Sequence, residues 1–200
     1  MLQERRKVKC TLVGNHGVGK TCLTISSTSG CFPGDYIPTL HENYTYRATV
    51  NHGTEQLELE VEFYDTAGHD DYDRIRIHSY PGTEVFLVCF SIVDPSSFEA
   101  VKAKWHPEIT LHCPNVPFLL VGLKLDLVND ERTLECLAER KQAPVQSCQG
   151  QEFAKEINAA KYIECSALTH KGIKAFLQDT AEIAVLPQEA IEETQKCLLM

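Results

Sequence analysis

A single glycine-rich segment constrains this chain more than any other part of its sequence. Residues 14–21 read Gly-Asn-His-Gly-Val-Gly-Lys-Thr, which fits the pattern G-x-x-x-x-G-K-T. An apolar run ends at Gly14, and residues 20–29 can form a helix closed by Gly30. Glycines at these places let the backbone wrap around a phosphate group with its amides pointing inward, and the helix then starts at the anion. The segment predicts a strand, a phosphate-binding loop and a helix, the first unit of an α/β fold.

The last two side chains of this segment and a second motif further along the chain predict a magnesium-assisted phosphate site. Lys20 is placed to reach the β and γ oxygens of a bound nucleotide, and the Thr21 hydroxyl to ligate Mg²⁺. A second motif, Asp65-Thr66-Ala67-Gly68, follows the apolar run 57–63. An acidic residue at the end of such a strand holds Mg²⁺ directly or through water, and Gly68 can present its backbone amide to the γ-phosphate.

Two further segments indicate which base is bound. Leu123-Lys124-Leu125-Asp126 and Cys165-Ser166-Ala167-Leu168 each follow an apolar strand-like run. In doubly wound sheets, ligands bind at the carboxyl ends of the strands. A carboxylate there can accept both the N1–H and the exocyclic amino group of guanine, a donor pair that adenine lacks. Asp126 therefore favours guanine. A P-loop kinase or ATPase is the alternative, against which Asp126 and Ser166-Ala167 argue.

Strand-like and helix-like segments alternate along the rest of the chain. Further strand-like runs are expected over residues 42–50, 56–64, 84–91 and 116–123. The first two are joined by the turn signal Asn51-His52-Gly53, and the last two are nearly continuous apolar runs, typical of strands covered on both faces. Asp94-Pro95 opens a helix of about 16 residues, and Pro187 ends a last helix. One face of that last helix is expected to carry Ile173, Phe176, Leu177, Thr180 and Ala184. The pattern predicts a doubly wound, mainly parallel sheet with one antiparallel edge hairpin.

The composition limits the partners of the chain. Its 28 acidic and 19 basic residues give a formal net charge of −9, which argues against a nucleic-acid binder. Apolar stretches reach about eight residues, far short of the roughly 20 that span a bilayer. None of the nine cysteines forms a C-x-x-C pair, so we expect reduced thiols in the cytoplasm rather than a zinc site.

These motifs resemble those of a Ras-superfamily small GTPase, and specifically one of the Rho/Rac type. The likeness is densest in four segments: Phe32–Thr39 (FPGDYIPT), Asp71–Arg74 (DYDR), Ser79–Pro81 (SYP) and Lys161–Thr169 (KYIECSALT). The resemblance spans about residues 7–186. It implies a six-stranded G domain over residues 1–186 and a short tail over 187–200. It also implies a Rho-type helical insert at about 129–144.

The resemblance further implies a monomeric switch that binds GTP or GDP with Mg²⁺, hydrolyses GTP, and meets effector proteins and an exchange factor in cytoskeletal signalling. By matching position, Phe32 packs against guanine, Tyr36 covers the γ-phosphate, Lys124 lies along the base and the Ala167 amide meets its O6. The implied nucleotide-binding set is Gly17, Val18, Gly19, Lys20, Thr21, Cys22, Phe32, Tyr36, Thr39, Gly68, Lys124, Asp126, Ser166, Ala167 and Leu168. The metal set is Thr21, Thr39 and, through water, Asp65, and the effector loop is Tyr36, Leu40, His41, Glu42, Asn43 and Tyr44.

The chain departs from the family at positions that matter for hydrolysis. Of the implied catalytic residues Lys20, Thr39, Gly68, His69 and His16, the two histidines are substitutions. His69 stands where the family has the glutamine that orients the attacking water, and His16 where it has a glycine beside the γ-phosphate. We expect slow hydrolysis and poor stimulation by a GTPase-activating protein (GAP), because imidazole orients water poorly and crowds an arginine finger. Three alternatives remain: neutral substitutions in a cycling switch, a protonated histidine that makes the switch sensitive to pH, and a GTP-loaded binding module controlled by abundance or modification.

Two more departures affect exchange and effectors. Leu123 replaces a polar residue that ties the base loop together, so we expect faster nucleotide exchange, by a factor of about five to ten for one lost hydrogen bond. His41 and Glu42 replace the usual Phe and Asp of the effector loop, which puts standard Rac effectors in doubt.

The last four residues predict a lipid anchor. Cys197-Leu198-Leu199-Met200 matches a C-a-a-X prenylation box, and a terminal Met is typical of farnesyl acceptors. Residues 187–196 carry three Glu and one Lys, so no basic patch supports the lipid, and one chain alone binds membranes weakly. We expect exchange between the cytoplasm and the cytoplasmic face of membranes, helped by a GDI-like prenyl-binding partner.

Overall fold

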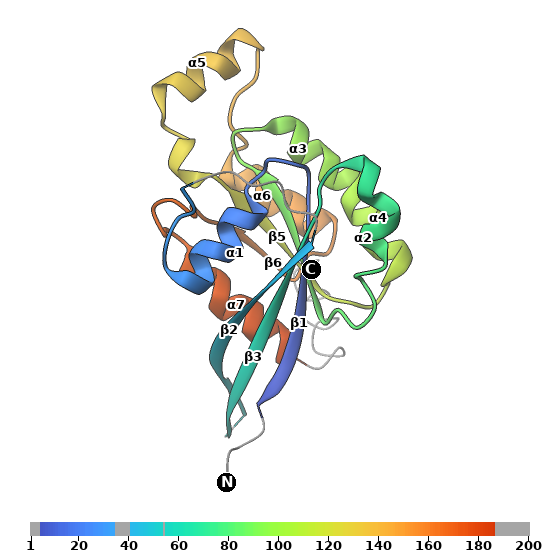
Figure 1. Cartoon of the computed structure of the whole chain (residues 1–200). Coiled ribbons are helices and arrows are strands. Elements are labelled where there is room, and N and C mark those ends of the chain that lie inside the picture. The colour runs from blue at the N-terminus through green and yellow to red at the C-terminus, as the bar shows by residue number, and fades with distance from the viewer. Residues whose placement is uncertain (1–4, 35–40, 54, 187–200) are drawn as a thin grey trace.

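A six-stranded sheet forms the centre of the computed structural model, which describes residues 5–34, 41–53 and 55–186 (Figure 1). The strands are β1 Arg6–Val13, β2 His41–His52, β3 Glu55–Thr66, β4 Val85–Ser91, β5 Phe118–Leu123 and β6 Lys161–Glu164. Their order is β2-β3-β1-β4-β5-β6. The β2–β3 pair at one edge is antiparallel, and all the other pairs are parallel. The predicted fold class is confirmed.

Helices cover both faces of this sheet. They are α1 Lys20–Ser29, η1 Asp70–Tyr72, α2 Asp73–Ile77, α3 Pro95–Ala100, η2 Val101–Trp105, α4 His106–His112, η3 Leu125–Leu127, α5 Glu131–Glu139, α6 Ser147–Glu156 and α7 Ile173–Val185. One core lies under α1 and α7, and a second lies under η2, α4 and α6. Figure 1 shows α1 and α7 on one side of the sheet and α2, α3 and α4 on the other.

The burial of the central strands explains why their sequences do not alternate between apolar and polar residues. Every residue of β4 and β5 is buried. Because successive side chains of a strand point to opposite faces, Val85, Leu87 and Cys89 enter the first core. Phe86 and Phe90 enter the second. The face of α7 that the sequence predicted is buried as well, from Ile173 to Ala184. The buried side chains of these strands therefore fix the position of their carboxyl ends, all of which lie at the same end of the sheet.

Two elements differ from the sequence prediction. β2 continues to His52, which pairs with Glu55, so Asn51 and His52 belong to the strand and, of the three residues predicted to form the turn, only Gly53 does so. Continued pairing adds ladder hydrogen bonds, and Gly53 has the positive φ of 62° that such a tight turn needs. The helix begins after Asp94 as expected, and the Asp94 side chain caps it by accepting a hydrogen bond from the Ser96 amide (3.2 Å). It runs over residues 95–112, however, and includes the π-helical segment η2.

A helix occupies the range that the resemblance assigns to an insert. α5 lies within residues 129–144, and Figure 1 shows it standing apart from the sheet. Asp130 caps it by accepting a hydrogen bond from the Thr133 amide (2.9 Å). Among the residues described, no helix is both long and apolar enough to cross a membrane. The cysteines in this part of the chain are all free thiols.

Candidate nucleotide-binding site

The predicted phosphate loop connects β1 to α1. Gly14, Gly17 and Gly19 have φ values of 145°, 75° and 113°, which only glycine adopts readily. A Cβ on Gly14 would lie 2.2 Å from the Cys89 carbonyl oxygen, because the loop leaves β1 directly beside β4. The backbone path of the loop therefore depends on glycine, as the motif predicted.

Lys20 lies beneath this loop and is only 6% exposed. Its ammonium group donates to the carbonyl oxygens of Gly14 (2.7 Å) and Asn15 (3.0 Å). An ammonium group has three N–H donors, so one is left for a phosphate oxygen. Burial lowers the pKa of Lys20, and the nearby carboxylate of Asp65 partly offsets this effect. A bound phosphate would favour the charged form further, so the residues fit an anionic ligand.

The Mg²⁺ ligands predicted in two motifs lie together. Thr21 Oγ1 donates a hydrogen bond to Asp65 Oδ2 at 2.5 Å. The two residues meet because β1 and β3 are parallel, so the motifs that follow them lie at the same end of the sheet. Asp65 is fully buried. In the described parts of the chain, no three His, Cys, Asp or Glu side chains form a metal cage by themselves. Mg²⁺ is commonly bound by one or two protein oxygens together with phosphate oxygens and waters, so this pair fits it.

Gly68 packs directly onto the phosphate loop. A Cβ at this position would lie 2.3 Å from the Gly14 carbonyl oxygen and 2.5 Å from the His16 nitrogen. No side chain can occupy that space, since both contacts are with backbone atoms. Thr66 anchors the same segment by donating to the Leu12 carbonyl oxygen (2.6 Å). The second motif is thus held against the place where the phosphates are predicted to lie.

The two base motifs meet at the ends of β5 and β6. Ser166 Oγ donates to Asp126 Oδ1 at 2.6 Å and accepts a hydrogen bond from the Thr169 amide at 3.0 Å. The side chains of Leu123 and Lys124 pass 3.7–3.9 Å from the Cβ position of Gly19. The predicted base motifs and phosphate loop are therefore neighbours, although more than 100 residues separate them in the sequence.

This arrangement agrees with a family comparison. The model of the Ras family matches residues 9–185. The chain belongs to the Ras family. Ras-family proteins are GTP-binding switches that bind guanine nucleotides, generally with Mg²⁺, hydrolyse GTP, and interact with effectors and exchange factors. Guanine recognition by Asp126 is in line with this membership, and a kinase or ATPase outside the GTPases is not.

The two unusual histidines lie next to each other. The ring centroids of His16 and His69 are 6.4 Å apart, edge to face. His16 is exposed, and the His69 side chain is 57% exposed. His69 Nδ1 accepts a long hydrogen bond from the Asp71 amide (3.4 Å), so this Ras-family protein uses the histidine as the cap of η1.

The other predicted site residues differ in their exposure, and some of them lie outside the described residues. Val18 and Ser166 are buried, whereas Phe32 and Leu168 are 44% and 54% exposed, so both of these apolar side chains are accessible to a ligand. Among the other described residues, Cys22 and Ala167 are partly buried and Glu42 and Asn43 are exposed. Tyr36, Thr39, Leu40 and Cys197 lie outside the described residues, as does the side chain of His41.

Sequence reasoning missed a buried polar cluster beside the site. Its members are Arg76, Asp73, Tyr80, Trp105 and Glu108, which we term the Arg76 cluster. Burial lowers the pKa of Arg76, but hydrogen bonds to Glu108 and Asp73 more than compensate, and the net pKa is raised. The sequence gives no signal for this cluster, because nothing local distinguishes a buried arginine from an exposed one.

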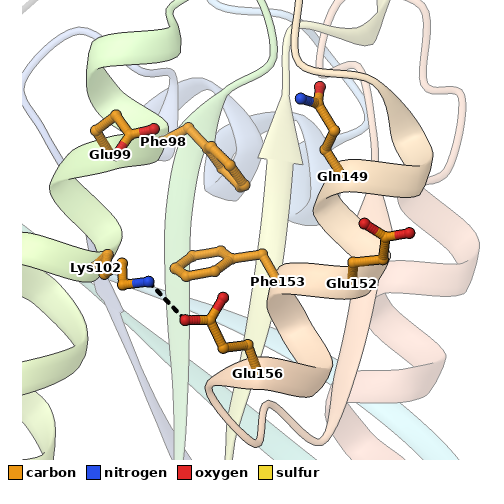
Figure 2. A pocket seen from close by; sticks show the side chains of 7 residues that line it. All are labelled: Phe98, Glu99, Lys102, Gln149, Glu152, Phe153 and Glu156. Carbon is orange, nitrogen blue, oxygen red and sulfur yellow. Dashed lines mark hydrogen bonds and ion pairs between the residues drawn. The ribbon is translucent and has the colours of Figure 1, made fainter.

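A pocket on another part of the surface is separate from this site. Figure 2 shows it between the α3–η2 helix and α6, lined by Phe98, Glu99, Lys102, Gln149, Glu152, Phe153 and Glu156. An ion pair of 2.6 Å between Lys102 and Glu156 crosses it. None of the predicted nucleotide-binding residues lines this pocket.

Proposed function

We propose that this protein is a Rho-type GTP-binding switch that hydrolyses GTP slowly, responds poorly to a GAP and is largely GTP-bound. The Rho type rests on the motif resemblance and on a helix, α5, at the position of the Rho-type insert. The slow hydrolysis rests on one observation: the adjacent imidazole rings of His16 and His69, 6.4 Å apart beside the phosphate loop.

The geometry of His69 explains why hydrolysis is slow. A water-orienting glutamine offers a carbonyl oxygen and an amide at the end of a flexible chain. His69 instead has one ring nitrogen turned toward the amide of Asp71 (3.4 Å), two residues along its own chain. Only its other nitrogen can face a water, and the short rigid ring cannot both accept from that water and donate to a phosphate oxygen.

The position of His16 explains the expected resistance to a GAP. Its exposed ring lies next to His69, at the mouth of the phosphate loop. An arginine finger from a GAP must enter this space to reach the γ-phosphate, and in Ras this contact accelerates hydrolysis by about 10⁵-fold. A ring there excludes the finger, whereas the glycine of the family does not.

Single-turnover GTP hydrolysis with and without a Rho GAP tests the proposal. We expect slow hydrolysis in the native protein with little GAP effect. The double variant His16→Gly/His69→Gln should regain GAP stimulation, and His170→Gln, at an exposed position outside the phosphate loop, is the matched control. Strong stimulation of the native protein by the GAP contradicts the proposal.

A non-catalytic, GTP-loaded binding module is the second candidate, favoured by the same pair of histidines. In that case activity follows protein abundance or modification instead of a nucleotide cycle. The nucleotide that copurifies with the protein separates the two: nearly pure GTP, with no conversion over hours, supports the module, and a mixture of GTP and GDP supports the slow switch.

Fast nucleotide exchange belongs to the same proposal. Leu123 is 2% exposed and packs near Gly19, so its side chain contributes an apolar contact where a polar residue would bind the loop. The loss of one hydrogen bond, worth about 1 kcal/mol, speeds release of the base by a factor of five to ten. Fast exchange with slow hydrolysis raises the GTP-bound fraction, because cells hold more GTP than GDP.

We propose the exposed edge of β2 as the effector surface. β2 is one of the two edge strands of the sheet, and Glu42 and Asn43 are exposed along it. Tyr44 donates a hydrogen bond to Glu42, and burial together with this carboxylate raises the pKa of the Tyr44 hydroxyl. Edge strands are common docking sites for partner strands. Effectors of the actin cytoskeleton follow from the Rho resemblance, with a preference changed by His41.

We also propose that Cys197 carries a prenyl group and that the protein acts as a monomer that exchanges between the cytoplasm and the cytoplasmic face of membranes with a GDI-like partner. The support is the box Cys-Leu-Leu-Met and the acidic segment before it. Cys197→Ser should move the protein from the membrane fraction to the soluble fraction. Cys136→Ser, at an exposed free cysteine of α5, is the control. Unchanged fractionation of the Cys197 variant contradicts the anchor.

A further inference from the structure

Arg76 is a fully buried charge that the predicted nucleotide chemistry does not use. Its side chain is 0% exposed, in the short helix α2. The guanidinium donates to both carboxylate oxygens of Glu108 (3.1 and 2.8 Å) and to Asp73 Oδ1 (2.7 Å). Removing a charge from water is costly unless it is paired and hydrogen-bonded, and a two-pronged arginine–carboxylate pair meets that need. The guanidinium is therefore held in one orientation by groups from both α2 and α4.

One hydrogen bond of this group reaches the second nucleotide motif. Arg76 Nη1 donates to the carbonyl oxygen of Ala67 at 3.0 Å. That oxygen and the N–H of Gly68 belong to the same peptide group, which is planar and trans, so they point in opposite directions and turn together. The bond thus fixes the Gly68 N–H in a direction away from Arg76. Gly68 itself is packed against Gly14 and His16 of the phosphate loop.

The same cluster is also hydrogen-bonded to the phosphate loop. The guanidinium of Arg76 lies over the ring of Trp105, 4.6 Å from its centroid. The indole N–H of Trp105 donates to Asn15 Oδ1 at 2.6 Å, and Trp105 is 1% exposed. Trp105 ends the π-helical segment η2, a feature often found at functional sites. Asn15 of the phosphate loop and Ala67 of the Asp65–Gly68 motif are therefore both hydrogen-bonded to the Arg76 cluster.

We propose that Arg76 is a positioning residue for the γ-phosphate: by holding the Ala67 carbonyl, it keeps the Gly68 N–H in the orientation that meets the γ-phosphate of GTP. Glu108 keeps Arg76 in place, and Trp105 ties this arrangement to the phosphate loop. The inference rests on the GTP-binding switch of the proposed function, and not on the Rho type or on slow hydrolysis.

The expected consequence is selective for GTP. GDP has no γ-phosphate, so an unrestrained Ala67–Gly68 peptide should weaken GTP binding and leave GDP binding unchanged. A hydrogen bond to a charged group corresponds to a change of about tenfold or more in affinity. A purely structural role of Arg76 would weaken both nucleotides alike.

The test compares the dissociation constants of GDP and of a non-hydrolysable GTP analogue, with Mg²⁺, on the full chain. Arg76→Met is expected to weaken the GTP analogue about tenfold and GDP less than twofold. Arg74→Met, at an exposed position of the same helix, should change neither. An equal loss for both nucleotides, or no loss for either, overturns the proposal.

A second variant covers the case in which Arg76→Met fails to fold. That change leaves the Glu108 carboxylate, 12% exposed, with the Tyr80 hydroxyl but without its cationic partner, whereas replacing both members of the pair leaves no uncompensated charge there. Arg76→Met/Glu108→Gln should therefore keep the thermal midpoint of the GDP form and still bind the GTP analogue about tenfold more weakly than the native protein does. Affinities equal to those of the native protein overturn the inference. If the native protein binds no guanine nucleotide, the proposed function itself has failed. Rapid GAP-stimulated hydrolysis removes only the slow-switch proposal.

Discussion

Replacing Ser166 by alanine tests whether the base site works as its geometry indicates. Ser166 is fully buried, and its hydroxyl makes two hydrogen bonds. It donates to Asp126 Oδ1 (2.6 Å) and accepts a hydrogen bond from the Thr169 amide (3.0 Å). Alanine removes both bonds and fills nearly the same space. The Asp126 carboxylate then loses the neighbour that holds it in the orientation proposed to meet the base.

The size of the effect follows from the type of bond. At 2.6 Å the Ser166–Asp126 bond falls in the range of hydrogen bonds to a charged oxygen. Such bonds contribute about 1.5–3 kcal/mol. Asp126 is partly exposed, so water can replace some of this contribution, and the lower end applies. We expect affinity to fall about tenfold, since 1.4 kcal/mol corresponds to a factor of ten. GTP and GDP should be affected equally, because both carry the same base.

The assay is the dissociation rate and affinity of fluorescent GDP and of a GTP analogue. The chain offers a matched control in Ser96→Ala, because the hydroxyl of Ser96 makes the same type of bond to Asp94 Oδ1 (2.5 Å) at the exposed start of α3. That variant should bind nucleotides as the native protein does. An affinity change below twofold in Ser166→Ala refutes the reasoning, as does an equal loss in the control.

Three further outcomes follow from the structure. Gly68→Ala places a Cβ 2.3–2.5 Å from backbone atoms of the phosphate loop, so the segment must move by about 1 Å to reach ordinary contact, and GTP affinity should fall at least about tenfold in the same binding assay. Among the described residues, no atom lies within 4 Å of a Cβ placed on Gly34, so Gly34→Ala should bind normally, and equal behaviour of these two variants contradicts the prediction. Gly150→Ala brings a Cβ to 2.2 Å from the ring of Tyr162, so urea unfolding should show a loss of about 1–3 kcal/mol, and a loss no larger than that of Gly34→Ala is the contrary result. Burial lowers the pKa of His106 below its ordinary value of 6.5. As the pH falls through 6.5, His106 therefore binds a proton in the unfolded chain before it does so in the folded one. The free energy of unfolding should not depend on His106 above pH 6.5 and should decrease as the pH falls below it. His106→Gln should flatten the change in urea midpoint between pH 7.5 and 5.5, and an unchanged slope would show that another group is responsible.

Much of the fold and of the site could be predicted from short segments. The phosphate loop, the Asp65–Gly68 motif and the two base motifs carry their geometry within a few residues, because glycine conformation, strand ends and ligand chemistry are local properties. The buried strands could be recognised as well, since a strand covered on both faces must be apolar throughout. The end of β2 and the π-helical segment were not predicted, because both depend on which neighbours an element pairs with or packs against.

The sequence alone therefore predicted the type of ligand, the order of the elements and the motifs that meet at the candidate site. Only the tertiary structure decided how those residues are held. Arg76 and Glu108 lie 32 residues apart in the sequence, and Asn15 and Trp105 lie 90 apart. Each of these side chains is unremarkable in its own segment. They become a cluster because packing removes them from water together, and a buried polar group must then find its partner among the groups buried with it.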